Sequence, residues 1–144
     1  MHNGNEKVAI AAAQAALQLK CPHRVILGTD GPAGSGVQPL GMLRMIALLS
    51  SLGGIPAELV FCFATGNTAR IRNLNCGLIE PGRAADFVFL DRAQHTAGRT
   101  LLESVQLGDI PGVGMVVIDG IVRCGRSRNT PPATEAPIVV GAGH

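Results

Sequence analysis

Hydrophobic residues in the first half of the chain recur at helical spacing. The Ala-rich segment 6–20 predicts a helix, because Ala is the best helix former and Asn5 can cap the first turn. Cys21-Pro22 marks its end, and Gly53-Gly54 and Thr65-Gly66-Asn67 interrupt the apolar pattern further along. The stretches on either side of these interruptions predict three more helices, over residues 39–52, 55–64 and 68–74.

One short apolar run stands apart from this helical pattern. Residues 24–28 (Arg-Val-Ile-Leu-Gly) are too few for a helix and predict a short buried strand. Residues 29–36 follow it as a polar, Gly-rich loop, and Asp30 stands at the head of that loop. The first half therefore reads as helix, strand, loop and further helices.

The second half carries the alternation and turn residues that are typical of strands. Strands are predicted over four segments: 77–83 (with a turn), 86–91, 114–119 and 121–124. Asp119-Gly120 separates the last two, which is a strong hairpin signal. A helix is expected over residues 100–107.

The change of character near residue 75 divides the chain. We expect one unit over residues 1–74, a second over residues 75–128, and a tail over residues 129–144. The tail is rich in Pro, Ala and Gly, and we expect it to be partly disordered. The chain has 144 residues, of which 47% are hydrophobic, with 19 Gly and 9 Pro. These values favour an α/β fold with frequent turns over a long helical bundle.

Charge and hydropathy exclude several classes of protein. The net charge is only +2, and the aromatic share is 3%, so the basic face and stacking aromatics of a nucleic-acid-binding protein are missing. The apolar runs are far shorter than the ~20 residues of a membrane span. No secretory signal is visible at the start, so we expect a cytoplasmic protein without membrane or nucleic-acid partners.

The cysteines and histidines do not form a recognisable motif. Four Cys and four His occur, and none stands at the spacing of a zinc site. We expect reduced and mostly buried thiols, with Cys62 buried in a helix between two Phe residues. Surface positions are expected for His2, His23, His95 and His144.

Asp30 is the acid whose position suggests chemistry. In α/β barrels the functional residues follow the C-terminal ends of the strands, and a carboxylate there can bind a metal and accept a proton from water. An Asp in a Gly-rich loop can equally cap the next helix or stabilise a turn, and both interpretations stay open on the residues alone. The loop lacks the Lys-Ser/Thr ending of a P-loop, so phosphate binding is disfavoured.

Three segments taken together resemble the closing section of the amidohydrolase superfamily, the metal-dependent group that includes imidazolonepropionase and dihydroorotase. The segments are Val25–Asp30, Thr65–Ala69 and Gly77–Asp91. In that superfamily an Asp follows the last barrel strand, a helix with a Thr-x-Asn/Gly-x-Ala turn comes next, and a Gly-rich run ending in Ala-Asp enters a small β-sandwich. The resemblance implies the last βα unit of a TIM barrel plus the C-terminal strands of the sandwich.

Further segments resemble the enamidases, cyclic-amide hydrolases of the same superfamily. They are Gly28–Gly36, Pro39–Arg44, Gly108–Gly112 and Ser127–Pro132. The resemblance implies hydrolysis of a carbon–nitrogen bond in a small cyclic amide. It also implies that Asp30 binds a divalent metal, Zn or Fe, and shuttles a proton. The loop after it would border the substrate through Gly31, Pro32, Gly34, Ser35 and Gly36.

The superfamily takes its other metal ligands from earlier barrel strands: an H-x-H pair, a Lys or Glu, and two further His. Those strands are missing here, and a catalytic zinc needs about three protein ligands. We therefore do not expect this chain alone to retain the metal, and whether it acts as an enzyme by itself stays open. Two other functions also stay open: a non-catalytic module that self-associates or binds a partner, and a nucleotide-binding protein that uses the Gly-rich loop.

A strand that lies between two barrel neighbours in the superfamily would have an open edge here. We therefore predict that the isolated chain is a homo-oligomer or requires a complementary barrel chain, because exposed strand edges and apolar faces promote association. Sedimentation velocity of the 144-residue chain checks this, and a monodisperse, stable monomer would contradict it.

Overall fold

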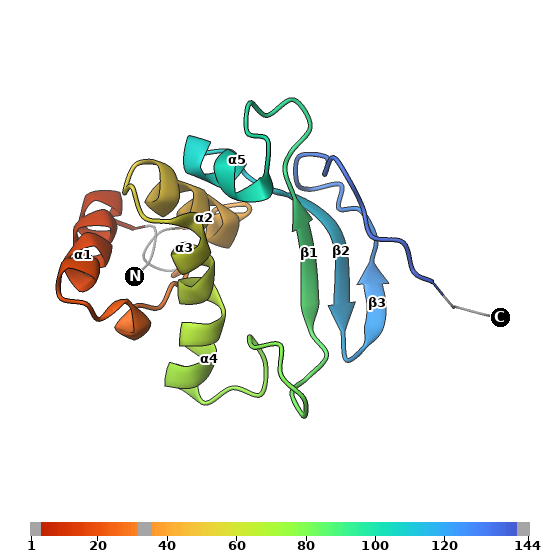
Figure 1. The fold of residues 1–144 in the computed structure, drawn as a ribbon, viewed down its shortest axis with the longest axis horizontal. Helices are drawn as coiled ribbons and strands as arrows, with labels where there is room; N and C mark the ends of the chain where they lie inside the picture. The colour runs from red at the N-terminus through yellow and green to blue at the C-terminus, as the bar shows by residue number, and fades with distance from the viewer. Residues whose placement is uncertain (1–3, 32–35, 141–144) are drawn as a thin grey trace.

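The structure, a computed structural model, describes residues 4–31 and 36–140. Helices form one side of it and an antiparallel sheet forms the other (Figure 1). The helices are α1 (Glu6–Gln18), η1 (a 3-10 turn, Pro22–Arg24), α2 (Gly41–Ser51), α3 (Ala57–Ala64), α4 (Gly66–Arg72) and α5 (Leu101–Leu107). The strands are β1 (Phe87–Asp91), β2 (Gly112–Ile118) and β3 (Ile121–Cys124).

The core lies among the helices. Met45 and Leu49 of α2, Val60 and Phe63 of α3, and Val105 of α5 are all at most 1% exposed. Helix α5 packs against α2 and α3 although it lies between β1 and β2 in the sequence. The predicted helices are confirmed in their positions, and burial of their apolar faces supplies most of the stabilisation that such short helices need.

Local signals set the ends of the first helix. The Asn5 side chain accepts a hydrogen bond from the Val8 backbone N–H at 3.1 Å, as predicted for a cap. The Gln14 side chain donates to the Gly53 carbonyl at 2.9 Å and ties α1 to the turn between α2 and α3. Several helix ends differ from prediction by one or two residues, and in particular Gly66 and Asn67 belong to α4, so that Thr65 alone separates it from α3.

The prediction of a strand over residues 24–28 is wrong. Arg24 closes the η1 turn, Val25 has an extended backbone, and residues 25–30 belong to no strand in the described part of the chain. Val25 and Leu27 are buried, so the apolar signal in the sequence was real. A strand also needs a neighbouring backbone, and here the Leu27 N–H donates instead to the Phe63 carbonyl of α3 at 3.2 Å.

The sheet has the order β1-β2-β3, with both pairs antiparallel. The hairpin between β2 and β3 is confirmed: Asp119 and Gly120 have φ of 52° and 75°, as a two-residue type I′ turn requires. The strand predicted over residues 77–83 is wrong. The predicted turn is present at Pro81-Gly82, and the rest of the segment has bends and irregular backbone, with Arg83 donating to the Leu74 carbonyl at 2.9 Å and forming an ion pair with Glu80 at 3.1 Å.

Part of the chain after β3 packs against the segment that follows β1. Ala133 is fully buried and forms a β-bridge with Ala93, and the Thr134 N–H donates to the Arg92 carbonyl at 3.0 Å. The expectation that the tail is partly disordered stays a prediction, and residues 141–144 lie outside the described residues. Gly112 of β2 leaves room for the tail, because a Cβ at this position would collide with the Ala133 nitrogen.

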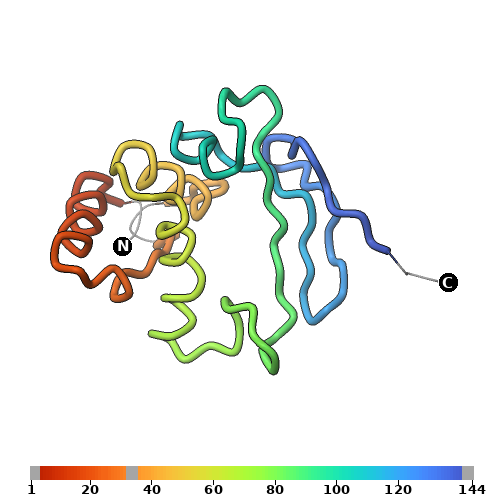
Figure 2. Tube along the Cα trace, in the orientation of Figure 1, coloured from red at the N-terminus to blue at the C-terminus, as the bar shows by residue number. Residues whose placement is uncertain are grey.

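The sheet lies beside the helical layer, and the tail runs along it (Figures 1 and 2). Many large apolar side chains stay exposed on both parts. Val8 and Leu19 of the α1 region, Val88 of β1 and Ile121 of β3 are each more than half exposed. The association predicted from the sequence stays a prediction.

The close approach at Gly112 generates a prediction about the tail. Gly112→Ala places a methyl group against the Ala133 backbone and is expected to destabilise the fold by about 1–3 kcal/mol, as overpacking does. Urea unfolding measures the loss, and faster hydrogen exchange of the Thr134 amide locates it. Gly125→Ala is the matched control, since no atom lies within 4 Å of its Cβ. Equal effects of the two substitutions would contradict a packed tail.

Candidate functional site

Asp30 lies at the exposed end of the extended segment that follows η1. Its φ is 52°, in the left-handed region that few residues other than Gly, Asn and Asp adopt. A Cβ on Gly31 would lie 3.3 Å from the Gly36 carbonyl, so the two ends of the Gly-rich loop approach each other. Pro32, Gly34 and Ser35 lie outside the described residues.

Asn67, at the start of α4, holds the segment that leads to Asp30. Its side-chain amide donates to the carbonyls of Pro22 and Val25, at 2.9 Å each. Asn67 is 6% exposed, and the two carbonyls lie 45 and 42 residues earlier in the chain. The sequence pattern indicated Asn67 only as a helix break, and the Thr-x-Asn-x-Ala motif was the signal that could have identified it.

The neighbours of Asn67 in that motif each have a structural task. The Thr65 hydroxyl donates to the Phe61 carbonyl at 2.8 Å, and the Thr68 hydroxyl donates to the Phe63 carbonyl at 2.9 Å. A Cβ on Gly66 would lie 2.9 Å from a methyl of Leu78, so Gly lets the chain beyond α4 pack closely. The motif therefore connects α3, α4 and the segment that enters the sheet.

The other motif carboxylates serve the sheet. Asp86 accepts from the Asp119 backbone N–H at 2.9 Å and supports the β2–β3 hairpin. Asp91 accepts from the Glu135 backbone N–H at 2.7 Å and fastens the tail beside β1. Both carboxylates thus satisfy backbone donors.

The described residues do not assemble a complete metal site. Within residues 4–31 and 36–140, no group of three or more His, Cys, Asp or Glu side chains is close enough to hold an ion. Asp30 is exposed and offers the carboxylate oxygens that divalent ions accept, so it fits one ligand position. The remaining ligands of any such site have to come from elsewhere.

The cysteines and histidines fit this picture only in part. All four cysteines are free, but none is buried, so the prediction of buried thiols is wrong. Cys62 is exposed because Phe63, its neighbour on α3, turns into the core, and adjacent helical residues point about 100° apart. His23 and His95 are exposed as predicted, whereas His2 and His144 lie outside the described residues.

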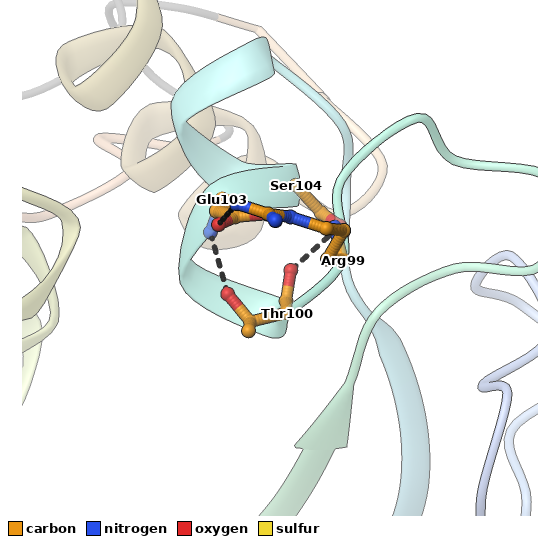
Figure 3. A network of polar contacts seen from close by, with 4 residues as sticks. All are labelled: Arg99, Thr100, Glu103 and Ser104. Carbon is orange, nitrogen blue, oxygen red and sulfur yellow. Dashed lines mark hydrogen bonds and ion pairs between the residues drawn. The ribbon is translucent and has the colours of Figure 1, made fainter.

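A polar network at the start of α5 is structural. Thr100 accepts from the Glu103 N–H at 3.2 Å, and Glu103 accepts from the Arg99 N–H at 2.8 Å and pairs with the Arg99 guanidinium at 3.1 Å (Figure 3). The hydrogen bonds from Arg99 lower the pKa of the Glu103 carboxyl, and those to Glu103 raise the pKa of Arg99. This arrangement is a helix cap with an ion pair at the surface.

A groove of 420 Å³ lies between the start of α1, α2 and the chain after α5. Glu6 and Arg44 bring opposite charges to it, and Arg44 donates to the Pro39 carbonyl at 3.0 Å. Asp30 does not line this groove.

Among the described residues, no helix is both long and apolar enough to cross a bilayer.

Comparison with known proteins gives consistent matches. The Amidohydrolase family matches residues 3–122. Enamidase from Eubacterium barkeri is 40% identical over 133 residues, which is 92% of this chain and 34% of enamidase. A 5'-deoxyadenosine deaminase from Methanothermobacter thermautotrophicus is 35% identical over 98 residues, covering 62% of this chain and 23% of the deaminase.

A solved structure matches as well. The crystal structure of enamidase, described as a member of the amidohydrolase superfamily, superposes with a TM-score of 0.88 at 39% identity. The match covers 92% of this chain and 34% of the enamidase chain. The chain thus spans about a third of the length of the enamidase that it matches.

The network at α5 predicts a pH dependence of stability. A carboxyl group whose pKa is lower in the folded state stabilises the fold when ionised, and this contribution is lost as pH falls through the folded pKa. Glu103→Gln is therefore expected to lower Tm at pH 7, with the difference from wild type vanishing in acid below the folded pKa. Thermal unfolding across pH checks this. Glu58→Gln, at an exposed acid in the first turn of α3, controls for the loss of one charge.

Proposed function

The chain belongs to the amidohydrolase family, and from this premise we propose that it is the C-terminal part of a metal-dependent hydrolase. The proposed reaction is cleavage of a carbon–nitrogen bond in a cyclic amide. The similarity to enamidase over 92% of the chain supports this reaction class. Because the chain spans about a third of that relative, the activity is proposed for the longer protein.

One observation carries the proposal: Asp30 is an exposed carboxylate at the end of an extended segment that is clamped to the α3–α4 junction. This segment forms no strand here, and we propose that in the longer protein, where neighbouring strands supply backbone partners, it takes the place of the last strand of a TIM barrel, whose functional residues follow the strand ends. Residues 1–74 then belong to the barrel, residues 75–128 to the C-terminal part of a β-sandwich, and residues 129–144 to the tail.

Asp30 has two tasks in the proposed reaction. It occupies one ligand position, and its carboxylate accepts the proton of the water that attacks the amide carbon and returns it to the leaving nitrogen. A divalent metal, Zn or Fe, supplies Lewis-acid polarisation when bound. The other ligands come from residues beyond those described here, either from the rest of the polypeptide or from a complementary barrel chain.

The Gly-rich loop borders the cyclic-amide substrate in this proposal. Gly31 and Gly36 bring the two ends of the loop together, and the approach of Gly31 to the Gly36 carbonyl leaves little room for a side chain. Glycines also allow a ligand to approach the backbone closely. We propose the same role for Pro32, Gly34 and Ser35, which lie outside the described residues.

Asp30→Asn tests the proposal in the polypeptide expressed at its full coding length. The amide cannot accept a proton, so turnover of six-membered lactams and cyclic imides, followed by mass spectrometry, is expected to fall by about 10²–10⁴-fold. Elemental analysis is expected to show less bound metal.

Asp86→Asn is the matched control, because an amide oxygen can still accept from the Asp119 N–H. Unchanged turnover and metal content in Asp30→Asn would refute the role of Asp30. Absence of ring opening with every cyclic amide, in a metal-loaded protein, would refute the substrate class.

A further inference from the structure

We infer that Asn67 is the positioning residue for Asp30. Its side chain is buried and bonds to the backbone of η1 and of the segment before the Gly-rich loop, and it acts on Asp30 through that backbone. The inference rests on the proposed function, because a position matters for Asp30 only if its carboxylate has a task.

The geometry of the Asn67 amide explains how it controls this backbone. An Asn side chain carries two N–H donors on one rigid plane. Here one donor goes to the Pro22 carbonyl and the other to the Val25 carbonyl, at 2.9 Å each. Two bonds from one rigid group to carbonyls three residues apart fix both the position and the direction of that segment.

A second contact extends this control toward Asp30. The Leu27 N–H donates to the Phe63 carbonyl, which also accepts from the Thr68 hydroxyl. The side chains of Val25 and Leu27 are buried on the same junction. The backbone is thus held from Pro22 to Leu27, and Asp30 follows only three residues later.

Other small residues cannot reproduce this clamp. Ser offers one donor on a shorter side chain, and Ala offers none. Loss of the donors leaves the buried Val25 carbonyl short of a partner, whereas the Pro22 carbonyl keeps the Val25 N–H, so the segment is expected to shift until water or another group satisfies the Val25 carbonyl. Mutation of a residue that orients a metal ligand without contacting the metal typically changes metal affinity by about 10–100-fold.

The experiment uses the polypeptide at its full coding length, loaded with Co²⁺ in place of the native metal. The visible d–d spectrum of Co²⁺ reports the geometry of its ligands, which a general loss of stability does not change. Asn67→Ala is expected to shift this spectrum and to weaken Co²⁺ binding by about 10–100-fold at a temperature where the protein is folded. Asn67→Ser is expected to give a Co²⁺ spectrum and affinity between those of wild type and Asn67→Ala. If the Ala variant fails to fold, the Ser variant alone tests the inference.

Ser50→Ala is the matched control. Ser50 is 4% exposed, and its hydroxyl donates to the Ile55 carbonyl at 3.1 Å, so it is another buried side-chain bond to a backbone carbonyl. It stabilises the α2–α3 turn rather than the segment before Asp30. Ser50→Ala is expected to lower Tm with the Co²⁺ spectrum and affinity unchanged.

The outcomes separate this inference from the proposed function. If Asp30→Asn alters the Co²⁺ spectrum while the Asn67 variants behave like Ser50→Ala, the positioning role is refuted and the proposed function stands. If Asp30→Asn leaves the spectrum and affinity unchanged, the proposed function fails, and the inference that rests on it fails with it.

Discussion

The junction between α3 and α4 is the constraint on which the rest of the structure depends. Asn67 clamps two carbonyls of the preceding segment, and the Phe63 carbonyl accepts from both Leu27 and Thr68. Phe63 is also fully buried in the helical core. Because these groups are buried, each needs its partner, and the segments they join cannot move independently.

The acids of this chain show how environment assigns different tasks to one residue type. Asp86 and Asp91 accept from backbone N–H groups and fasten the hairpin and the tail. Asp30 has a left-handed backbone and stands in a Gly-rich loop at the end of a clamped segment. Unusual backbone conformations held by their surroundings concentrate at functional sites, which fits the proposed role of Asp30.

The amount of exposed apolar surface reflects how the two parts of the structure are built. The helices bury their apolar faces mainly against one another, while the sheet leaves Val88 and Ile121 more than half exposed. The chain spans about a third of the length of the enamidase that it matches. In the proposed full-length enzyme, the rest of the barrel and sandwich covers these apolar residues.

The sequence by itself determined the features that depend on neighbouring residues: the helices, the Asn5 cap, the Asp-Gly hairpin and the family to which the chain belongs. Only the tertiary structure decided which backbone pairs with residues 25–30, where the tail runs, which side of α3 carries Cys62, and what Asn67 holds. These features depend on contacts between residues as many as 45 positions apart. Local propensity contains no information on such distant partners, because the hydrogen bonds exist only once the helices have packed.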